Sequence, residues 1–239
     1  MTTDDFSLDG YARIVERVLN RGYRVEDFLS ADPAQRHLVL RHDVDFDIEA
    51  ALAMARMETS HGWHATYFIL LRSEFYNPNA PRSVAALRAF SGHEVGLHFD
   101  ASIHAGNEKA LAVELRREAS MLSDIIGREV RTFSLHRPSP VLLDGQFEVE
   151  GFTNAYNPRF FRDMGYCSDS QGLWRFGPPD EHAALREGRG LQLLTHPIWW
   201  TASAAATDPS ARVDEFLERR AMLLDHEAAR NCKTYRSKR

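Results

Sequence analysis

The sequence has few cysteines and no long apolar run. Only two of its 239 residues are cysteine, Cys167 and Cys232. They show neither the close pairing of a zinc-binding motif nor the even-numbered framework of a disulfide-rich secreted protein. No stretch approaches the roughly 20 apolar residues that a transmembrane helix needs. We therefore expect a reduced protein without a membrane span.

The chain also lacks a large excess of charge of either sign. Lys and Arg number 29 against 34 Asp and Glu, a formal net charge of −5, which predicts no attraction to nucleic acid or to anionic membranes. The first nine residues carry three aspartates and have neither the basic nor the apolar region of a secretory signal peptide. The expected location is the cytoplasm.

What the sequence does contain is an alternation of helical and strand patterns along its length, which is typical of a parallel sheet covered by helices. The expected helices are 7–21, 47–61, 81–91, 107–126 and 208–231. The expected strands are 37–40, 65–71, 94–98, 131–135, 153–156, 166–168 and 191–195. The pattern and length fit a single α/β-barrel domain, 1–239. Helix 7–21 is expected to pack on the outside of this barrel. The irregular segment 138–179 is rich in large apolar residues, so we expect ordered loops near a site.

The most informative residues follow the first expected core strand. Alternate side chains of an extended segment point to the same side, so Asp43 and Asp45 should converge. By the same rule His42 should point away from Asp43, and His93 away from Glu94, so we expect both histidines to be structural. Two carboxylates held together are unfavourable unless a metal ion or a shared proton relieves them. One acid would bind the ion and the other would handle protons. The alternative is a surface turn with two solvated aspartates.

Polar residues also follow three other expected strands. His98 and Asp100 end one, His136 and Arg137 end another, and His196 ends the last. The C-terminal ends of parallel strands meet at one rim of a barrel, where functional residues gather. Imidazole and carboxylate are ligands preferred by zinc and similar divalent ions. The sequence therefore predicts a site for one divalent metal ion, with zinc as the expected ion.

These motifs resemble those of the polysaccharide deacetylases with the NodB-homology fold, carbohydrate esterase family 4. The matching motifs lie within residues 37–200 and comprise the two acids, Gly92–His98, Arg137-Pro138, Asp169 with Trp174, and Leu194-Thr195-His196. The resemblance implies a distorted (β/α) barrel, related to the TIM barrel and built from about seven parallel strands. It also implies metal-dependent removal of N-acetyl groups from amino sugars.

The resemblance implies a role for each of these residues. Asp43 would be the catalytic base, and Asp45 and His98 would bind the metal. Arg137 would pair with Asp43 and keep it ionised. His196 would protonate the leaving amine.

The third metal ligand is less certain, because this chain departs from the family pattern. The family has a second histidine four positions after the first, where this sequence has Ser102. The candidates are His104, Asp100 and His136. We favour His136, because a residue at a strand end is held more rigidly than one in a loop.

Four further residues are expected to bind substrate. Leu194 and Trp174 would line the acetyl pocket, with Trp174 stacking on a sugar face. Asp169 belongs to the same motif as Trp174. Trp199 would form part of a sugar platform. A core position for Trp174, and an anchoring role for Trp199 in the last loop, are the alternatives.

A cytoplasmic member of this family would act on an N-acetylated nucleotide sugar, a lipid-linked sugar or a small precursor. This description is similar to the WbmS-like branch, which is associated with surface polysaccharide or O-antigen synthesis. One alternative is a hydrolase of non-sugar amides that uses the same site. Another is a sugar-binding pseudoenzyme without metal, which the absence of the motif histidine at Ser102 favours.

Overall fold

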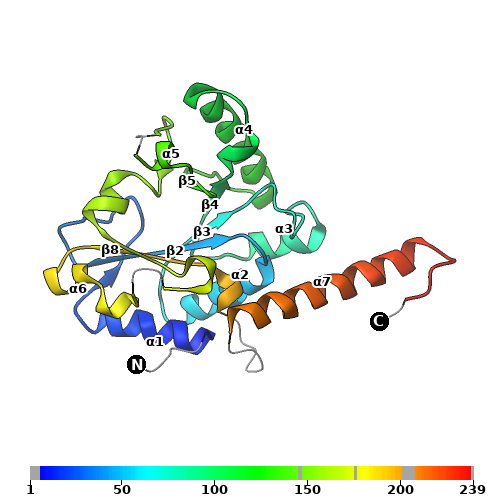
Figure 1. Cartoon of the computed structure of the whole chain (residues 1–239), viewed down its shortest axis with the longest axis horizontal. Coiled ribbons are helices and arrows are strands. Elements are labelled where there is room, and N and C mark those ends of the chain that lie inside the picture. Colours follow the sequence, from blue (N-terminus) through cyan, green and yellow to red (C-terminus); the bar gives the residue numbers. More distant parts are fainter. Residues whose placement is uncertain (1–5, 145–146, 175–176, 201–207, 238–239) are drawn as a thin grey trace.

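The computed structural model describes residues 6–144, 147–174, 177–200 and 208–237, and a curled parallel sheet lies at its centre (Figure 1). The strands are β1 (Arg24–Val25), β2 (His37–Val44), β3 (Thr66–Ile69), β4 (Glu94–Phe99), β5 (Thr132–Leu135), β6 (Thr153–Asn154), β7 (Gly165–Ser168) and β8 (Leu191–Thr195). They run in the order β6-β5-β4-β3-β2-β8-β7, and β1 pairs with β2. Every pairing is parallel.

The seven strands β2 to β8 form a half-barrel, which confirms the predicted distorted α/β barrel of about seven parallel strands. The two ends of the strand order meet through side chains. Tyr156, just after β6, and Tyr166 in β7 have ring centroids 6.4 Å apart. The curl therefore brings the C-terminal ends of the strands toward a common rim. The assignment of 1–239 to a single domain stays a prediction.

The helices lie around the outside of the curl (Figure 1). They are α1 (Leu8–Leu19), α2 (Ile48–Ser60), α3 (Pro81–Arg88), α4 (Glu108–Ile126), α5 (Pro140–Asp144), α6 (Ala183–Glu187) and α7 (Pro209–Asn231). All five expected helices are present with ends within three residues of those predicted. The sequence did not predict α5 and α6, because five residues each are too few to show a helical period.

Strand β2 is the central element for the site, and all eight of its residues are buried. Its odd-numbered side chains face the inside of the curl, where Val39 joins an apolar cluster with Phe68 and Phe160. Its even-numbered side chains face the helices, where Leu38 and Leu40 join the larger core. This alternation lets one strand serve two environments, as the pleat requires.

A buried carboxylate on α2 holds the helix-facing side of β2. Glu58 is fully buried and accepts hydrogen bonds from Tyr11 Oη and Tyr67 Oη, each at 2.6 Å. His42 Nε2 lies 2.9 Å from the same carboxylate. Burial by itself raises the pKa of Glu58, but the charge of His42 and these hydrogen bonds lower it by more. His42 thus lies behind the strand, as the alternation predicts.

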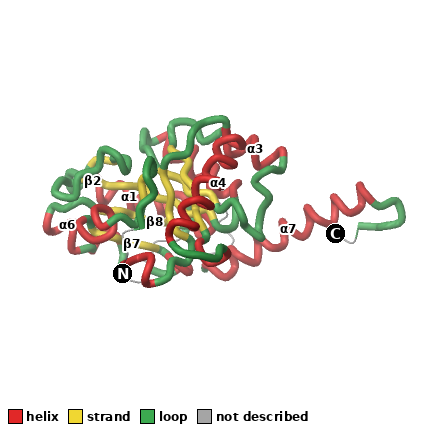
Figure 2. Tube along the Cα trace, turned by 90° about the horizontal axis from the view of Figure 1, so that it is seen from above, coloured by secondary structure: helices red, strands yellow, loops and turns green. Residues whose placement is uncertain are grey.

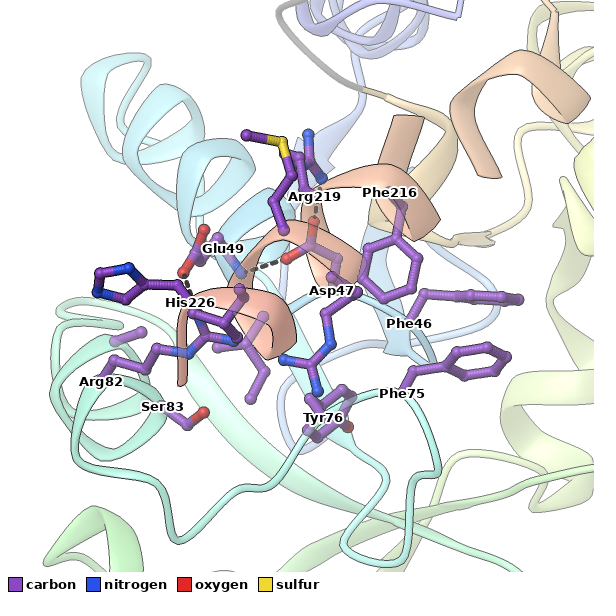
Figure 3. A pocket seen from close by; sticks show the side chains of 15 residues that line it. Phe46, Asp47, Glu49, Phe75, Tyr76, Arg82, Ser83, Phe216, Arg219 and His226 are labelled. Carbon is purple, nitrogen blue, oxygen red and sulfur yellow. Dashed lines mark hydrogen bonds and ion pairs between the residues drawn. The ribbon is translucent and has the colours of Figure 1, made fainter. Parts of the chain in front are cut away.

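The last helix, α7, extends away from the other elements (Figures 1 and 2). Near its start, Phe216 packs against the rings of Phe46 and Phe75. Arg219 Nη2 donates to Asp47 Oδ2 at 2.6 Å, and Asp47 also caps α2. Figure 3 shows the cavity of about 350 Å³ that α7 forms here with α2 and α3. None of the described helices is long and apolar enough to cross a bilayer.

Candidate metal centre

The polar residues that the sequence places at strand ends meet at the C-terminal rim of the sheet. Asp45 follows β2, and His98 lies on β4, which β3 separates from β2 in the sheet. His136 follows β5, which pairs with β4, and His196 follows β8, which pairs with β2. The parallel arrangement therefore assembles one site from four strands that are far apart in the sequence.

Three of these side chains form a group that could hold a metal ion. Asp45, His98 and His136 each offer one ligand atom, and these atoms lie within 4.8 Å of one another. Asp45 Oδ1 is 3.2 Å from His98 Nε2 and 3.5 Å from His136 Nδ1. The two imidazole nitrogens are 3.1 Å apart. The structure therefore brings together the two predicted ligands and the favoured third one.

The donor set fits a divalent cation. Asp45 Oδ1 is buried and has no hydrogen-bond partner in the described part of the chain, which is unusual for a buried polar atom. A cation between the carboxylate and the two imidazoles would satisfy it, and these are zinc-type ligands. Burial by itself raises the pKa of Asp45, but the imidazoles of His136 and His98 lower it to well below its usual value. The carboxylate is therefore ionised, as a ligand must be.

His98 is held in place by a hydroxyl group. Its Nδ1 lies 2.6 Å from Ser134 Oγ on the adjacent strand β5. This contact leaves Nε2 directed at Asp45. A partner on the second ring nitrogen is the usual means by which proteins orient a metal-binding imidazole.

The second acid, Asp43, is paired with an arginine that the sequence reasoning overlooked. Arg41 is fully buried and donates from Nε to Asp43 Oδ1 at 3.0 Å and from Nη2 to Oδ2 at 2.8 Å. Its Nη1 donates to Gln192 Oε1 at 3.2 Å. Burial by itself raises the pKa of Asp43, but the charge of Arg41, followed by that of His98, lowers it by more. Asp43 is thus an oriented, ionised carboxylate.

The alternation rule could have identified Arg41. Arg41, Asp43 and Asp45 are spaced by two, so the rule that joins the two acids also places this arginine on their side of the strand. A buried arginine in an apolar strand needs a paired acid, and Asp43 is the nearest one in sequence. Arg137, the expected partner of Asp43, is instead an exposed residue that lines a neighbouring cavity. The expected pairing is therefore corrected to Arg41.

On the opposite side of Asp45, His196 forms a pair with a buried aspartate. His196 Nδ1 lies 2.6 Å from Asp169 Oδ1, and Trp200 Nε1 donates to Asp169 Oδ2 at 2.6 Å. His196 Nε2 is thereby left facing Asp45 Oδ2 at 3.9 Å. Burial by itself lowers the pKa of His196, but the charge of Asp169 and its hydrogen bond raise it to about 9. His196 is therefore protonated at neutral pH.

We expect the substitution Asp169→Asn to lower the pKa of His196 from about 9 toward the ordinary 6.5, because it removes the carboxylate that stabilises the imidazolium. The measurement is an NMR titration of the His196 ring in metal-free protein. With a raised pKa, the pair stabilises the fold fully below pH 6.5, and this contribution is lost as the pH rises through about 9. Asp100→Asn is the control and should leave the titration unchanged. A pKa still near 9 in Asp169→Asn would assign the shift to the other carboxylates.

The other candidate ligands lie outside the triad. His104 Nε2 contacts Glu118 Oε1 at 3.1 Å, and its ring stacks on Phe99. Asp100 accepts hydrogen bonds from the backbone and hydroxyl of Ser102. Both side chains are thus engaged in local structure.

The four residues expected to bind substrate have different surroundings. Asp169 is fully buried behind His196, so its expected place at the substrate is corrected to a partner of the histidine. Leu194 and Trp199 are also buried, which leaves little of either side chain accessible. Trp174 is half-buried, and its ring lies 5.9 Å from that of Trp200. Contact of Trp174, Leu194 and Trp199 with a sugar stays a prediction.

No family model matches the sequence, and no curated protein is significantly similar to it. Among solved structures, the chain is similar to a family 4 carbohydrate esterase from Bacillus anthracis, with 16% identity, coverage of 87% of this chain and 84% of that chain, and a TM-score of 0.46. It is also similar to a Streptococcus pyogenes deacetylase solved in complex with acetate, with 11% identity, coverage of 79% and 80%, and a TM-score of 0.44.

A third similar structure is a pseudoenzyme of the same esterase family from Bacillus anthracis. The identity is 16% and the TM-score 0.42, and the match covers 78% of this chain but 62% of that one. This chain thus spans less than two thirds of the length of the pseudoenzyme. The narrower WbmS-like branch stays a prediction.

Proposed function

We propose that this protein is a metal-dependent hydrolase that removes the N-acetyl group from an amino sugar or a sugar precursor. One observation carries the proposal: a possible metal triad lies between an ionised carboxylate, Asp43, and a protonated imidazole, His196. Amide hydrolysis needs a group that accepts a proton from water and a group that donates one to the leaving amine. In the metal-free site the pKa of Asp43 is lowered and that of His196 is raised to about 9, so the site holds one group of each kind.

Asp45, His98 and His136 would hold the ion, and we propose zinc because the set joins two imidazoles and a carboxylate. When bound, a divalent ion of this kind polarises a carbonyl and makes water more acidic. Asp43 and His196 remain outside this set, and so they are free to move protons. The ligand assignment is a proposal that rests on the buried, unsatisfied oxygen of Asp45.

The protein's own groups would then act in sequence. Asp43 accepts the proton of the water that attacks the acetyl carbon, and Arg41 keeps Asp43 ionised and oriented before the attack. His196 donates its Nε2 proton to the amine nitrogen as the carbon–nitrogen bond breaks, which releases acetate and a free amino sugar. Asp169 fixes the ring through Nδ1, so that Nε2 is the nitrogen that faces the reaction.

The substrate proposed here is a soluble N-acetylated sugar or sugar nucleotide used in surface polysaccharide synthesis, such as that of O-antigen. We also propose a cytoplasmic location, and an enzyme there would not act on finished cell wall. We propose no nucleic-acid partner, in line with the net charge of −5.

The direct test is to incubate the zinc-loaded protein with a panel of N-acetylated sugars and nucleotide sugars and to measure acetate. We expect acetate release from at least one of them, and its loss after treatment with a chelator. Cyclic and linear non-sugar amides belong in the same panel, since release from these alone would support the amide-hydrolase alternative. Sugar binding without metal or acetate release would identify a binding protein instead.

A further inference from the structure

A cavity of about 730 Å³ lies on the rim beside the candidate metal centre. One wall is formed by the residues after β4, from Ala101 to the first turn of α4, and the other by residues 137–142 after β5. His98 lies on β4 and His136 lies next to Arg137, so both walls continue directly from metal-triad residues. Small-molecule sites typically measure roughly 300–1,000 Å³. The cavity is thus large enough for a part of the substrate that extends beyond the acetyl group.

Arg137 faces this cavity without a partner. In the described part of the chain its guanidinium forms no hydrogen bond or ion pair. Asp43 does not engage it either, since both oxygens of Asp43 accept hydrogen bonds from Arg41. The backbone of Arg137 has a φ of 48°, which a residue other than glycine rarely adopts, and Pro138 follows it. An arginine held in this position remains available for a ligand.

The other charged groups around the cavity leave it with an excess of positive charge. Lys109, also exposed and without a partner in the described chain, lines the opposite wall. Glu108 is the one acid among the described residues that line the cavity. Two cations thus face a single acid. The remaining lining includes Leu111 and Leu142, which offer apolar surface between the charges.

We propose that this cavity receives an anionic group of the substrate, a phosphate or a carboxylate carried by the N-acetylated sugar, and that Arg137 and Lys109 bind it. The inference rests on the proposed function and narrows its substrate class. A planar guanidinium can bind two oxygens of a phosphate or carboxylate at once, and the ammonium of Lys109 adds a second charge from the facing wall. Neutral sugars would lack both contacts.

The test compares four sugars: N-acetylglucosamine, its 1-phosphate, its 6-phosphate, and N-acetylglucosaminuronic acid. Acetate release and calorimetric affinity are measured for the wild type, Arg137→Met and Lys109→Met. The matched control is Arg117→Met, because Arg117 is an exposed arginine on α4 whose one ion pair within the described residues is with Glu114, at 3.9 Å. The phosphates and the uronate separate the two sources of negative charge.

We expect wild-type protein to prefer at least one anionic sugar over N-acetylglucosamine. Arg137→Met should raise the KM for that sugar by about 10- to 100-fold, the usual range for a lost hydrogen bond to a charged group, with kcat unchanged. The KM for the neutral sugar should not change, and Arg117→Met should behave as the wild type. Lys109→Met should also raise the KM for the anionic sugar, by a smaller factor.

Equal use of neutral and anionic sugars, or an equal effect of Arg137→Met on both, would overturn the inference and leave the deacetylase proposal intact. The absence of acetate from every sugar would contradict the proposed function. Calorimetry alone would then decide whether the cavity binds an anionic sugar. Weaker binding of an anionic sugar to Arg137→Met would still support the cavity as its site. If no anionic sugar binds the wild type, the inference is wrong.

Discussion

Replacing Asp43 with asparagine should lower kcat for acetate release by about 100- to 10,000-fold, the contribution of one general acid-base group. Asparagine keeps the shape of the side chain but cannot accept the proton of the attacking water. Because Asp43 is not among the three proposed ligands, the variant should still bind one equivalent of metal. The measurements are steady-state kinetics and metal content on the same purified sample.

Two controls make this result interpretable. Asp100→Asn changes another rim carboxylate, which accepts hydrogen bonds from Ser102 and lies outside the proposed site, and it should retain nearly full activity. A thermal melt of Asp43→Asn is needed as well, since Arg41 loses its buried counter-charge and breaking a buried pair costs about 3–5 kcal/mol. A folded, metal-loaded Asp43→Asn with wild-type kcat would remove Asp43 from the mechanism.

The second large effect is expected from the metal triad. His98→Ala and His136→Ala should each weaken metal binding by more than the 10- to 100-fold typical of losing an outer partner of a ligand. Each removes one of the three ligands proposed among the described residues, and activity should fall with metal occupancy. The measurement is competition with a chromophoric chelator, followed by acetate release at a fixed metal concentration.

His104→Ala is the matched control for the triad. His104 is the sequence alternative for the third ligand, but it contacts Glu118 and stacks on Phe99. We therefore expect this variant to bind metal like the wild type. Metal binding that survives His136→Ala and is lost in His104→Ala would transfer the third position to His104.

Much of the fold could be predicted because its signals are local. The helices and most strands follow from hydrophobic periodicity, and the rim position of His98 and His196 follows from where parallel strands end. The two-residue strands β1 and β6 carry too little pattern to set their ends. For β6, the sequence predicted 153–156 where the strand is Thr153–Asn154.

The pairing of side chains across the site is less accessible from sequence. Asp169 and His196 lie 27 positions apart, and only the pairing of β7 with β8 brings their segments together. The bond that Arg41 donates to Gln192 depends in the same way on the pairing of β2 with β8. Arg41 itself could have been identified from the sequence, because it shares the two-residue spacing of Asp43 and Asp45. The family motif pointed instead to Arg137. A motif gives the order of residue types along the chain, but it does not show which of the two arginines contacts Asp43.

The two-sided use of β2 limits how this segment can vary in length. Its inward side chains include Arg41 and Asp43, and its outward side chains include His42, which is bonded to Glu58. A single insertion or deletion within the strand would exchange the two sets, sending the reactive groups into the apolar helix interface. We therefore expect this stretch to accept single replacements more readily than changes of length, which the loops on either side can absorb.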